Sequence, residues 1–320
     1  DNWMWPRHTC DFSMFRIYAD KDNNPADYSE DNVPYKPVKS LEVSIKGNQP
    51  GDFTMIIGYP GTTNRFMTAS ELREKVLTND ITIKCRTVRQ DILMEDMLAD
   101  PKVKIQYASK YTSSSNAWKK YIGMNETFQK LDVEARRAAE EAAFKAWVNQ
   151  DPKRQAKYGD ALNLIDGAIN SRMEALTKRL YLSETVSRIE ILSIARSVNN
   201  AIKRGNAAEY VPTAESFYKD YYQPIDKECF IAVMNDFANN LPADFKPAYF
   251  TEKLAEYGSV ENWAEKVFSD DLAYAEEFGT RMQDWYRADI LPTVNRINQE
   301  IRLLYRDYMR GQMAFQKDKV

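Results

Sequence analysis

The feature that most constrains this chain is a change in the spacing of its apolar residues near Thr68. After that position, apolar side chains recur every three or four residues, which is the spacing that places them on one face of an α-helix. The spacing is clearest at positions 128, 131, 135, 138, 142 and 146, at positions 182, 186, 189, 192 and 195, and at positions 290, 294, 297, 301, 304 and 308. We therefore predict that helices dominate from Thr68 to the end of the chain.

Capping and helix-breaking residues divide this region into separate helices. Thr68-Ala-Ser-Glu71 has the pattern of a capping box, which predicts the start of the first helix. Proline and glycine predict further helix ends. These signals are Asp151-Pro152, Arg204-Gly205, Val211-Pro212, Gln223-Pro224, Leu241-Pro242, Lys246-Pro247 and Gly258-Ser259. The polar stretch Ser113–Trp118 also predicts an interruption between helical segments, either as an ordinary cap, which we favour, or as a loop that presents Asn116.

The first 66 or so residues have a different pattern, which is typical of strands and loops. Three runs read as strands, at residues 12–18, 41–46 and 53–57, and the second alternates strictly between apolar and polar residues. Pro25, Pro34 and Pro37 predict a long surface loop between the first two runs. Since three such strands cannot close a barrel or bury both faces of a sheet, we expect this β part to be incomplete.

The net charge and composition of the chain exclude several classes of protein. A formal net charge of −3, from 44 basic and 47 acidic residues, gives no electrostatic basis for binding nucleic acid or a membrane surface. No apolar run approaches the roughly 20 residues of a spanning helix, so we expect a soluble protein without a membrane span. The three cysteines, Cys10, Cys85 and Cys229, lack the CxxC spacing of zinc sites. Their odd number leaves at least one thiol without an internal partner, and whether the other two form a disulfide stays open.

Catalytic residue types are sparse. His8 is the only histidine, and the chain has no GxSG or GDSG motif, so we do not expect a self-sufficient serine hydrolase. Paired acidic residues in the helical part are expected to lie on solvated helix faces. They are Glu140, Glu141, Asp270, Asp271, Glu276 and Glu277.

Several motifs resemble one family. They are Asp1-Asn-Trp-Met-Trp-Pro-Arg-His-Thr9, Asp11-Phe-Ser-Met-Phe-Arg16, Asn32-Val-Pro-Tyr-Lys-Pro37, Gly51-Asp-Phe-Thr-Met55 with Gly58-Tyr-Pro-Gly61, and Ser115-Asn-Ala-Trp-Lys119 with Gly123-Met124. Together they resemble the bacterial dipeptidyl-peptidase seven and eleven family of serine exopeptidases, and the likeness runs through essentially the whole chain.

The resemblance implies a mainly α fold with a small β part: a large α-helical domain inserted in an incomplete chymotrypsin-like β-barrel. It assigns residues 1–66 to the catalytic barrel, residues 67–313 to a helical cap and residues 314–320 to the start of the return to the barrel. Family members carry the catalytic histidine before the position of residue 1 and the nucleophilic serine after that of residue 320. The absent initiator methionine also suggests a processed or excised piece. We therefore expect an internal fragment that is inactive alone.

The same resemblance implies the site residues. Asp11 matches the aspartate of the catalytic triad, which orients and charges the histidine. Asn2 and Trp3 match residues that bind the free α-amine of the substrate, and Asn116 matches a further amine contact. Arg7 has a supporting role, and His8 is not the catalytic base of this family. No metal or cofactor is implied. Cys10 departs from the family pattern, because glycine is expected before the aspartate.

The implied partner is an oligopeptide with a free N-terminus, without nucleic acid or a membrane span. The family also implies a homodimer and a periplasmic or cell-surface location in a Gram-negative bacterium. In this family, residues after the nucleophilic serine mostly set the preference for acidic or hydrophobic residues at the penultimate substrate position. These 320 residues therefore do not predict that preference. The alternative is a non-catalytic helical module that binds a peptide or a protein. A nucleic-acid binder is disfavoured by the charge.

Overall fold

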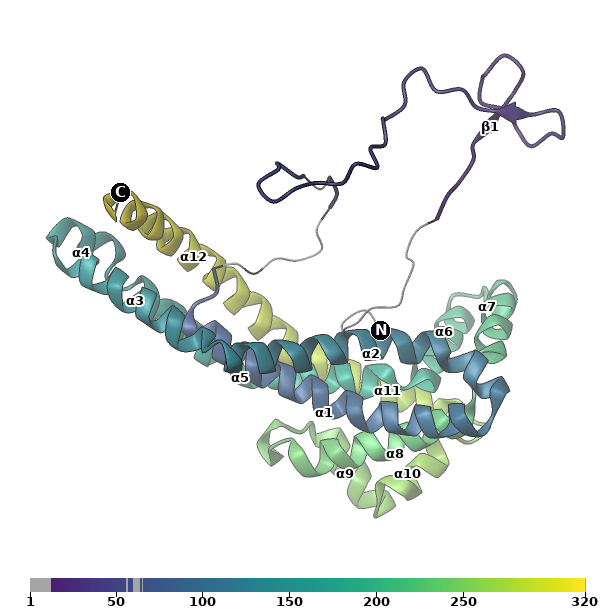
Figure 1. The fold of residues 1–320 in the computed structure, drawn as a ribbon. Helices are drawn as coiled ribbons and strands as arrows, with labels where there is room; N and C mark the ends of the chain where they lie inside the picture. The colour runs from purple at the N-terminus through teal and green to yellow at the C-terminus, as the bar shows by residue number, and fades with distance from the viewer. Residues whose placement is uncertain (1–12, 56, 60–63, 65, 320) are drawn as a thin grey trace. The chain divides into compact units, whose positions relative to one another are not determined.

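A computed structural model describes residues 13–55, 57–59, 64 and 66–319 of the chain. The described residues fall into two units, an N-terminal unit that ends before Phe66 and a helical unit from Phe66 onward. Each unit is described separately below (Figure 1).

The helical unit contains every helix among the described residues. The α-helices are α1 (Ala69–Ala99), α2 (Pro101–Lys130), α3 (Val133–Asn149), α4 (Pro152–Tyr158), α5 (Ala161–Glu184), α6 (Glu190–Lys203), α7 (Ala207–Lys219), α8 (Gln223–Asn240), α9 (Ala248–Tyr257), α10 (Val260–Val267), α11 (Ala273–Trp285) and α12 (Leu291–Lys319). Short helical turns are η1 (Val186–Arg188), η2 (Ala243–Phe245) and the π-helical η3 (Tyr286–Ile290). The prediction of a helical region after Thr68 is confirmed. None of these helices combines the length and apolar character that crossing a bilayer requires.

The N-terminal unit contains one small sheet among its described residues. Strand β1 (Tyr18–Ala19) pairs antiparallel with β2 (Val33–Pro34), with Tyr18 opposite Pro34 and Ala19 opposite Val33. The loop between them is held by the side chain of Asn23, which accepts from the backbone N–H of Lys36 at 2.8 Å and donates to its carbonyl at 3.0 Å. The fold is therefore mostly helical with a two-stranded sheet.

The three predicted strands are wrong for the residues that the structure describes. Residues 13–17, 41–46, 53–55 and 57 form no strand, although Tyr18 at the end of the first run does. Leu41, Val43 and Ile45, the apolar side of the alternating run, are 93%, 87% and 97% exposed. Alternation predicts a strand only where another strand takes up its backbone hydrogen bonds and another layer covers its apolar face. No described residue pairs with the backbone of residues 41–46, and none covers the apolar side chains of that run.

Helices α1 and α2 form an antiparallel hairpin, and both of its turns follow from the sequence. The predicted capping box is confirmed: Thr68 Oγ1 accepts from the Glu71 backbone N–H, and a Glu71 carboxylate oxygen accepts from the Thr68 N–H. At the other end, Asp100 ends α1 and caps α2, because its carboxylate accepts from the Lys102 N–H at 2.8 Å. Pro101 follows at the first position of α2, where a missing N–H costs little.

Two large apolar cores and a small cluster of Ala175, Ile290 and Val294 hold the helical unit together. The larger core is built from α1, α2, α5, α6 and α8–α11, and its centre contains Phe230, Phe237, Phe250 and Phe278, all fully buried. The smaller core joins α3, α4 and α5 to α12, with Phe144 packed edge-on against Tyr308 at 5.7 Å between ring centroids. Helices α3 and α4 accordingly lie beside the C-terminal part of α12 (Figure 1).

The predicted helical spacing of apolar residues is confirmed at the end of the chain. For the other two runs of apolar residues the prediction is partly wrong. Positions 290, 294, 297, 301 and 308 are buried along η3 and α12. Positions 182, 186, 189, 192 and 195 are buried, but the helix breaks between α5 and α6. The break follows Thr185, whose hydroxyl donates to the Tyr181 carbonyl at 2.5 Å. Positions 131, 135, 138, 142 and 146 are exposed and Phe128 is half-buried, and the chain turns at Asp132, where φ is 49°. Helix α3 buries Phe144, Trp147 and Val148 instead, because large side chains bury more area than alanines.

Two predicted interruptions are also wrong. Ser113–Trp118 lies inside the continuous helix α2, and Val211-Pro212 lies inside α7. Pro212 is the sixth residue of α7, so it removes one backbone hydrogen bond near the start of the helix without ending it. The remaining predicted helix ends are confirmed, including the cap at Asp151 and the left-handed Gly258 that ends α9. The assignment of residues 1–66, 67–313 and 314–320 to barrel, cap and return segment stays a prediction.

The smaller core yields a stability prediction at Gly311. A Cβ on Gly311 would lie 2.8 Å from Cζ of Phe144 and 3.2 Å from Cδ1 of Tyr158, both buried rings. Gly311→Ala should therefore lower the free energy of unfolding by about 1 kcal/mol, because overpacking costs about 1–3 kcal/mol and exceeds the gain in helix propensity of about 1 kcal/mol. Urea unfolding measures the change. Gly167→Ala on α5, with no atom within 4 Å of the new Cβ, is the matched control and should stabilise. Equal effects of the two substitutions would contradict the packing argument.

Candidate functional site

Most of the site residues implied by the sequence lie outside the described part of the chain. They are Asn2, Trp3, Arg7 and Asp11, together with His8 and Cys10. Their roles stay predictions. Asn116 is described, and the structure shows how it is held.

Asn116 lies on the face of α2 that is turned away from α1. Two residues before it, the Ser114 carbonyl accepts from Nη1 of Arg86 on α1 at 3.0 Å. Two residues after it, Nε1 of Trp118 donates to Oγ1 of Thr87 at 2.9 Å. Positions two apart on a helix are rotated by about 200°, so Asn116 faces the opposite side from Ser114 and Trp118. Asn116 is half-buried, and its amide has no hydrogen-bond partner among the described residues.

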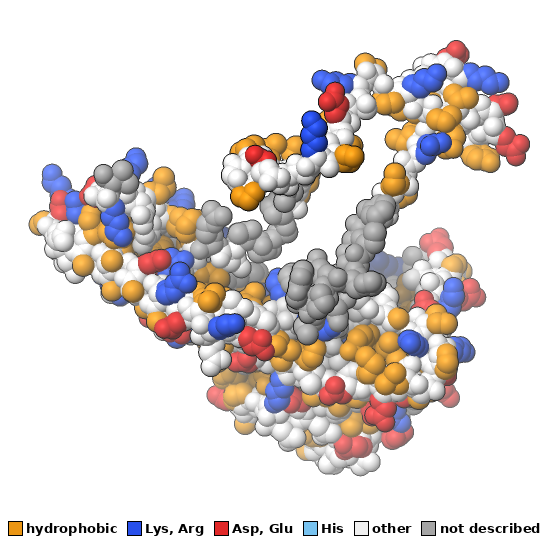
Figure 2. Space-filling view, in the orientation of Figure 1, with side chains coloured by type: hydrophobic (Ala, Val, Ile, Leu, Met, Phe, Trp, Pro, Cys, Tyr) orange, Lys and Arg blue, Asp and Glu red, His pale blue; other side chains and the backbone are white. Residues whose placement is uncertain are grey.

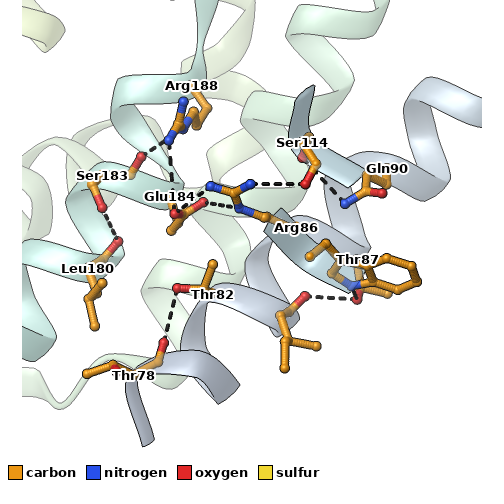
Figure 3. Close-up of polar contacts among 12 residues, drawn as sticks. Thr78, Thr82, Arg86, Thr87, Gln90, Ser114, Leu180, Ser183, Glu184 and Arg188 are labelled. Atoms are coloured by element: carbon orange, nitrogen blue, oxygen red, sulfur yellow. Dashed lines mark hydrogen bonds and ion pairs between the residues drawn. The ribbon is translucent and has the colours of Figure 1, made fainter. Parts of the chain in front are cut away.

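A buried ion pair fixes this part of α2. Nε and Nη2 of Arg86 donate to the two carboxylate oxygens of Glu184, at 2.9 and 3.1 Å, in a bidentate pair that joins α1 to α5 (Figure 3). The side chains of Arg86 and Glu184 are only 11% and 7% exposed. Because the third donor of Arg86 binds the Ser114 carbonyl, one guanidinium holds α1, α2 and α5 together.

Next to this ion pair is a cavity of about 540 Å³ between α1, α2, η1, α6 and α8. Its lining is mixed: four cationic side chains, two carboxylates, and apolar and hydroxyl groups. The lining residues are Arg86, Arg89, Leu93, Tyr107, Lys110, Ser113, Ser114, Ala117, Ser187, Arg188, Glu190, Ile225, Asp226 and Cys229. Ser113 and Ala117 belong to α2, so the cavity and Asn116 lie on adjoining faces of the same helical turn.

Asp226 on α8 caps a neighbouring helix from inside this cavity. Its two oxygens accept from the backbone N–H groups of Glu190 and Ile191, the first two residues of α6, each at 2.8 Å. Tyr221 donates its hydroxyl to the same carboxylate at 3.3 Å. Burial raises the pKa of Asp226 from its ordinary 3.8 to about 7, although the two backbone hydrogen bonds oppose the shift.

The two cysteine thiols in the helical unit are buried and poorly reactive. Cys85 and Cys229 are both buried and free, so they do not form a disulfide. Burial raises the pKa of each thiol to about 12, which keeps it protonated and poorly nucleophilic. Among the described residues, no group of three or more His, Cys, Asp or Glu side chains could hold a metal ion.

The acidic pairs expected on solvated faces divide into two kinds. Glu140, Asp270, Asp271 and Glu277 are exposed as predicted, whereas Glu141 and Glu276 are half-buried and accept hydrogen bonds from other helices. Glu141 accepts from the Ala69 N–H at 2.7 Å, the first backbone donor of α1, so α3 caps α1. Acidic and basic side chains otherwise intersperse over the face of the helical unit in view (Figure 2).

No pattern in the sequence predicts the roles of Arg86, Glu184 or Asp226. Each is one of many charged residues in an amphipathic helix, and nothing in its spacing separates it from a solvated neighbour. The 98-residue separation of Arg86 and Glu184 places their contact beyond any local pattern.

Comparisons with known proteins identify the family to which this chain belongs. The sequence model of peptidase S46 matches residues 1–318. The chain belongs to the peptidase S46 family.

Individual S46 relatives agree with this assignment. The chain is 38% identical over 284 residues to dipeptidyl-peptidase 7 of Porphyromonas gingivalis, covering 87% of this chain and 40% of the relative. It is 37% identical over 289 residues to the Asp/Glu-specific dipeptidyl-peptidase of Porphyromonas endodontalis, again covering 87% and 40%. The crystal structure of P. endodontalis DPP11 with the dipeptide Arg-Glu superposes with a TM-score of 0.71 at 33% identity, covering 97% of this chain and 48% of that one. The chain thus spans less than half the length of these S46 relatives.

The Arg86–Glu184 pair yields a double-mutant prediction. Arg86→Met leaves a buried carboxylate whose nearest remaining cation is Arg188 at 4.0 Å, so the free energy of unfolding should fall by about 3–5 kcal/mol. Adding Glu184→Met removes the unpaired charge and should restore most of the loss. Urea unfolding of both single variants and the double variant measures the coupling. A double variant no more stable than Arg86→Met alone would contradict this account.

The Asp226 cap yields a pH prediction. Asp226→Asn leaves one of the two N–H groups of α6 without an acceptor and should cost about 1–3 kcal/mol of stability. Because the folded pKa lies above the ordinary value, the folded state binds this proton more tightly. The carboxyl group therefore contributes stability below about pH 4 that is lost as the pH rises through 7.

The difference in unfolding free energy between the unmodified protein and Asp226→Asn should accordingly shrink from pH 4 to pH 8. Chemical denaturation across this range measures it. Asp91→Asn, at an exposed position of α1, is the control and should give a small, flat difference. A difference for Asp226→Asn that grows with pH would show that its pKa is lowered instead.

Proposed function

We propose that this chain supplies the triad aspartate, part of the amine-binding site and the helical cap of a serine exopeptidase that releases dipeptides from the free N-terminus of oligopeptides. The observation that carries the proposal is the S46 match over residues 1–318, together with relatives named as dipeptidyl peptidases. The catalytic histidine and serine are contributed by sequence outside these 320 residues, so the chain alone is inactive.

Asp11 is the proposed acid of the triad. A buried aspartate that accepts from Nδ1–H of a histidine fixes the tautomer whose Nε2 removes the proton of the serine hydroxyl. It also stabilises the imidazolium that forms as the serine attacks the scissile carbonyl. The family pattern places this histidine before the position of residue 1, so we assign His8 no catalytic role.

Asn2, Trp3 and Asn116 are the proposed contacts of the substrate amine, with Arg7 in support. Amide oxygens accept from an ammonium group, and an indole ring walls the pocket around it. An ammonium held two residues from the scissile bond sets the length of the released product, because a longer chain cannot place its amine there. The structure supports Asn116 in this role: the helix around it is fixed by Arg86 and Trp118, and its half-buried amide has no described partner.

The N-terminal unit is the proposed part of a chymotrypsin-like barrel into which the helical unit is inserted. The exposed apolar side chains of Leu41, Val43 and Ile45 support this proposal, because an alternating strand needs a covering layer that the described residues lack. From the family resemblance alone we also propose a homodimer and a periplasmic or cell-surface location in a Gram-negative bacterium.

The first test of this function addresses the triad. In the full-length protein that contains these residues, Asp11→Asn should lower kcat by about four orders of magnitude, because the histidine loses its correct tautomer. Release of dipeptides from a fluorogenic peptide with a free amine measures the rate. The fold should persist, as shown by an unchanged circular dichroism spectrum. A folded variant with near-normal turnover would exclude Asp11 from the triad.

The second test addresses the amine contact. Asn116→Ala should lower kcat/KM for free-amine peptides by about ten- to a hundredfold, the range expected for hydrogen bonds to a charged group. An N-acetylated peptide with the same sequence should remain a poor substrate of both proteins. Asn163→Ala, at an exposed position of α5, is the matched control and should leave the kinetics unchanged. If this chain is instead a non-catalytic helical module that binds a peptide or a protein, neither Asn116→Ala nor Asp11→Asn will alter peptide release by the full-length protein.

A further inference from the structure

The cavity beside the Arg86–Glu184 pair has an excess of positive charge. Arg86 and Arg188 both contact one carboxylate, Glu184, at 2.9 and 4.0 Å. Arg89, one helical turn beyond Arg86 on α1, lines the same cavity. Its buried Nε has no hydrogen-bond partner among the described residues, and none of their carboxylates forms an ion pair with it. Arg86, Arg89 and Arg188 thus contribute three guanidinium groups, and only Arg86 and Arg188 form an ion pair with Glu184.

The other charged groups of the cavity do not compensate for Arg89. Lys110 pairs with Glu190 at 2.5 Å, so these two charges cancel. Asp226 directs both oxygens at backbone N–H groups of α6. Burial lowers the pKa of Arg89, with further lowering from Arg188 and Arg86, yet an arginine in a protein keeps its proton. Arg89 is half-buried, and a charged guanidinium without a partner at such a position is costly unless an anion or water completes it.

The shape of the cavity indicates the size of such an anion. About 540 Å³ is far more than one inorganic ion fills and lies within the range of small-molecule sites. The floor is apolar and buried, formed by Leu93, Ile225 and Cys229. The rim is exposed and polar, with Ser113 of α2 and Ser187 and Arg188 of η1. A ligand with an apolar body and one anionic group matches this division.

We propose that this cavity binds a small organic carboxylate, with its carboxylate held by Arg89 and Arg188 and its apolar part against Leu93, Ile225 and Cys229. This site differs from the proposed amine site at Asn116, which lies on an adjoining face of α2 and would hold a cation. Its ligand chemistry is opposite in charge, so the two sites are separable by experiment.

Binding is tested on the full-length protein that contains these residues, by isothermal titration calorimetry with phenylacetate at constant ionic strength. Phenethylamine has the same ring with a positive charge and should not bind. Acetate and inorganic phosphate test the anionic group without the apolar part, and both should bind at least tenfold more weakly than phenylacetate. Phosphate binding as tight as that of phenylacetate would overturn the assignment to an organic acid.

Arg89→Met should weaken phenylacetate binding by about ten- to a hundredfold, and Arg89→Lys should restore part of it. Without ligand, Arg89→Met should be as thermally stable as the unmodified protein or more so, because it removes an unpaired, half-buried charge. Arg188→Met, at the exposed rim, provides a second variant that leaves the bidentate Arg86–Glu184 pair in place, and it should weaken binding by several-fold. Arg302→Met on α12 is the exposed control and should bind normally.

Either of two results would overturn the proposal. No measurable phenylacetate binding at millimolar concentration, or binding that survives both Arg89→Met and Arg188→Met, would exclude this site. Because Asn116 and Asp11 are untouched by these variants, loss of the carboxylate site and loss of dipeptide release are distinguishable outcomes.

Discussion

The helical unit depends on the buried ion pair between Arg86 and Glu184. A second pair, Arg172 with Glu74, joins the same two helices, and its members are also 98 residues apart. Each pair is displaced from the other by twelve residues on both helices, or about 18 Å, so α1 and α5 run parallel in one register. Any slip between them would separate a buried carboxylate from its guanidinium, at a cost of several kcal/mol. The ion pairs thus specify an alignment that apolar packing alone leaves open.

That alignment is what gives α2 its position. Because Arg86 also binds the Ser114 carbonyl and Thr87 binds Trp118, the turn that carries Asn116 is fixed on its α1 side and presents the amide on the other. A side chain that must meet a substrate amine needs such support, since a small displacement weakens a directional hydrogen bond. The same turn borders the cavity with the unpaired Arg89. One structural frame therefore positions both sites that we propose.

Helices in this unit also satisfy each other's ends. Asp226 of α8 caps α6, and Glu141 of α3 accepts from the first N–H of α1. The Asp226 carboxylate replaces the side-chain cap that α6 lacks in its own sequence, where Ile189 stands at the N-cap position. A cap donated from another helix forms only when both helices pack, so it couples local helix ends to the tertiary fold.

The sequence by itself determined the helical character after Thr68, the capping box at Glu71 and the buried face of α12, because each depends on neighbours within a few residues. It also determined the family, through motifs such as Asp11–Arg16. It misassigned Ser113–Trp118 as an interruption and residues 41–46 as a strand. The polar residues of α2 are held by partners on α1, and the alternating run needs a covering layer that no described residue supplies. Only the tertiary structure decided the Arg86–Glu184 pair, the cap from Asp226 and the unpaired Arg89, since burial and long-range pairing of a charge leave no trace in local spacing.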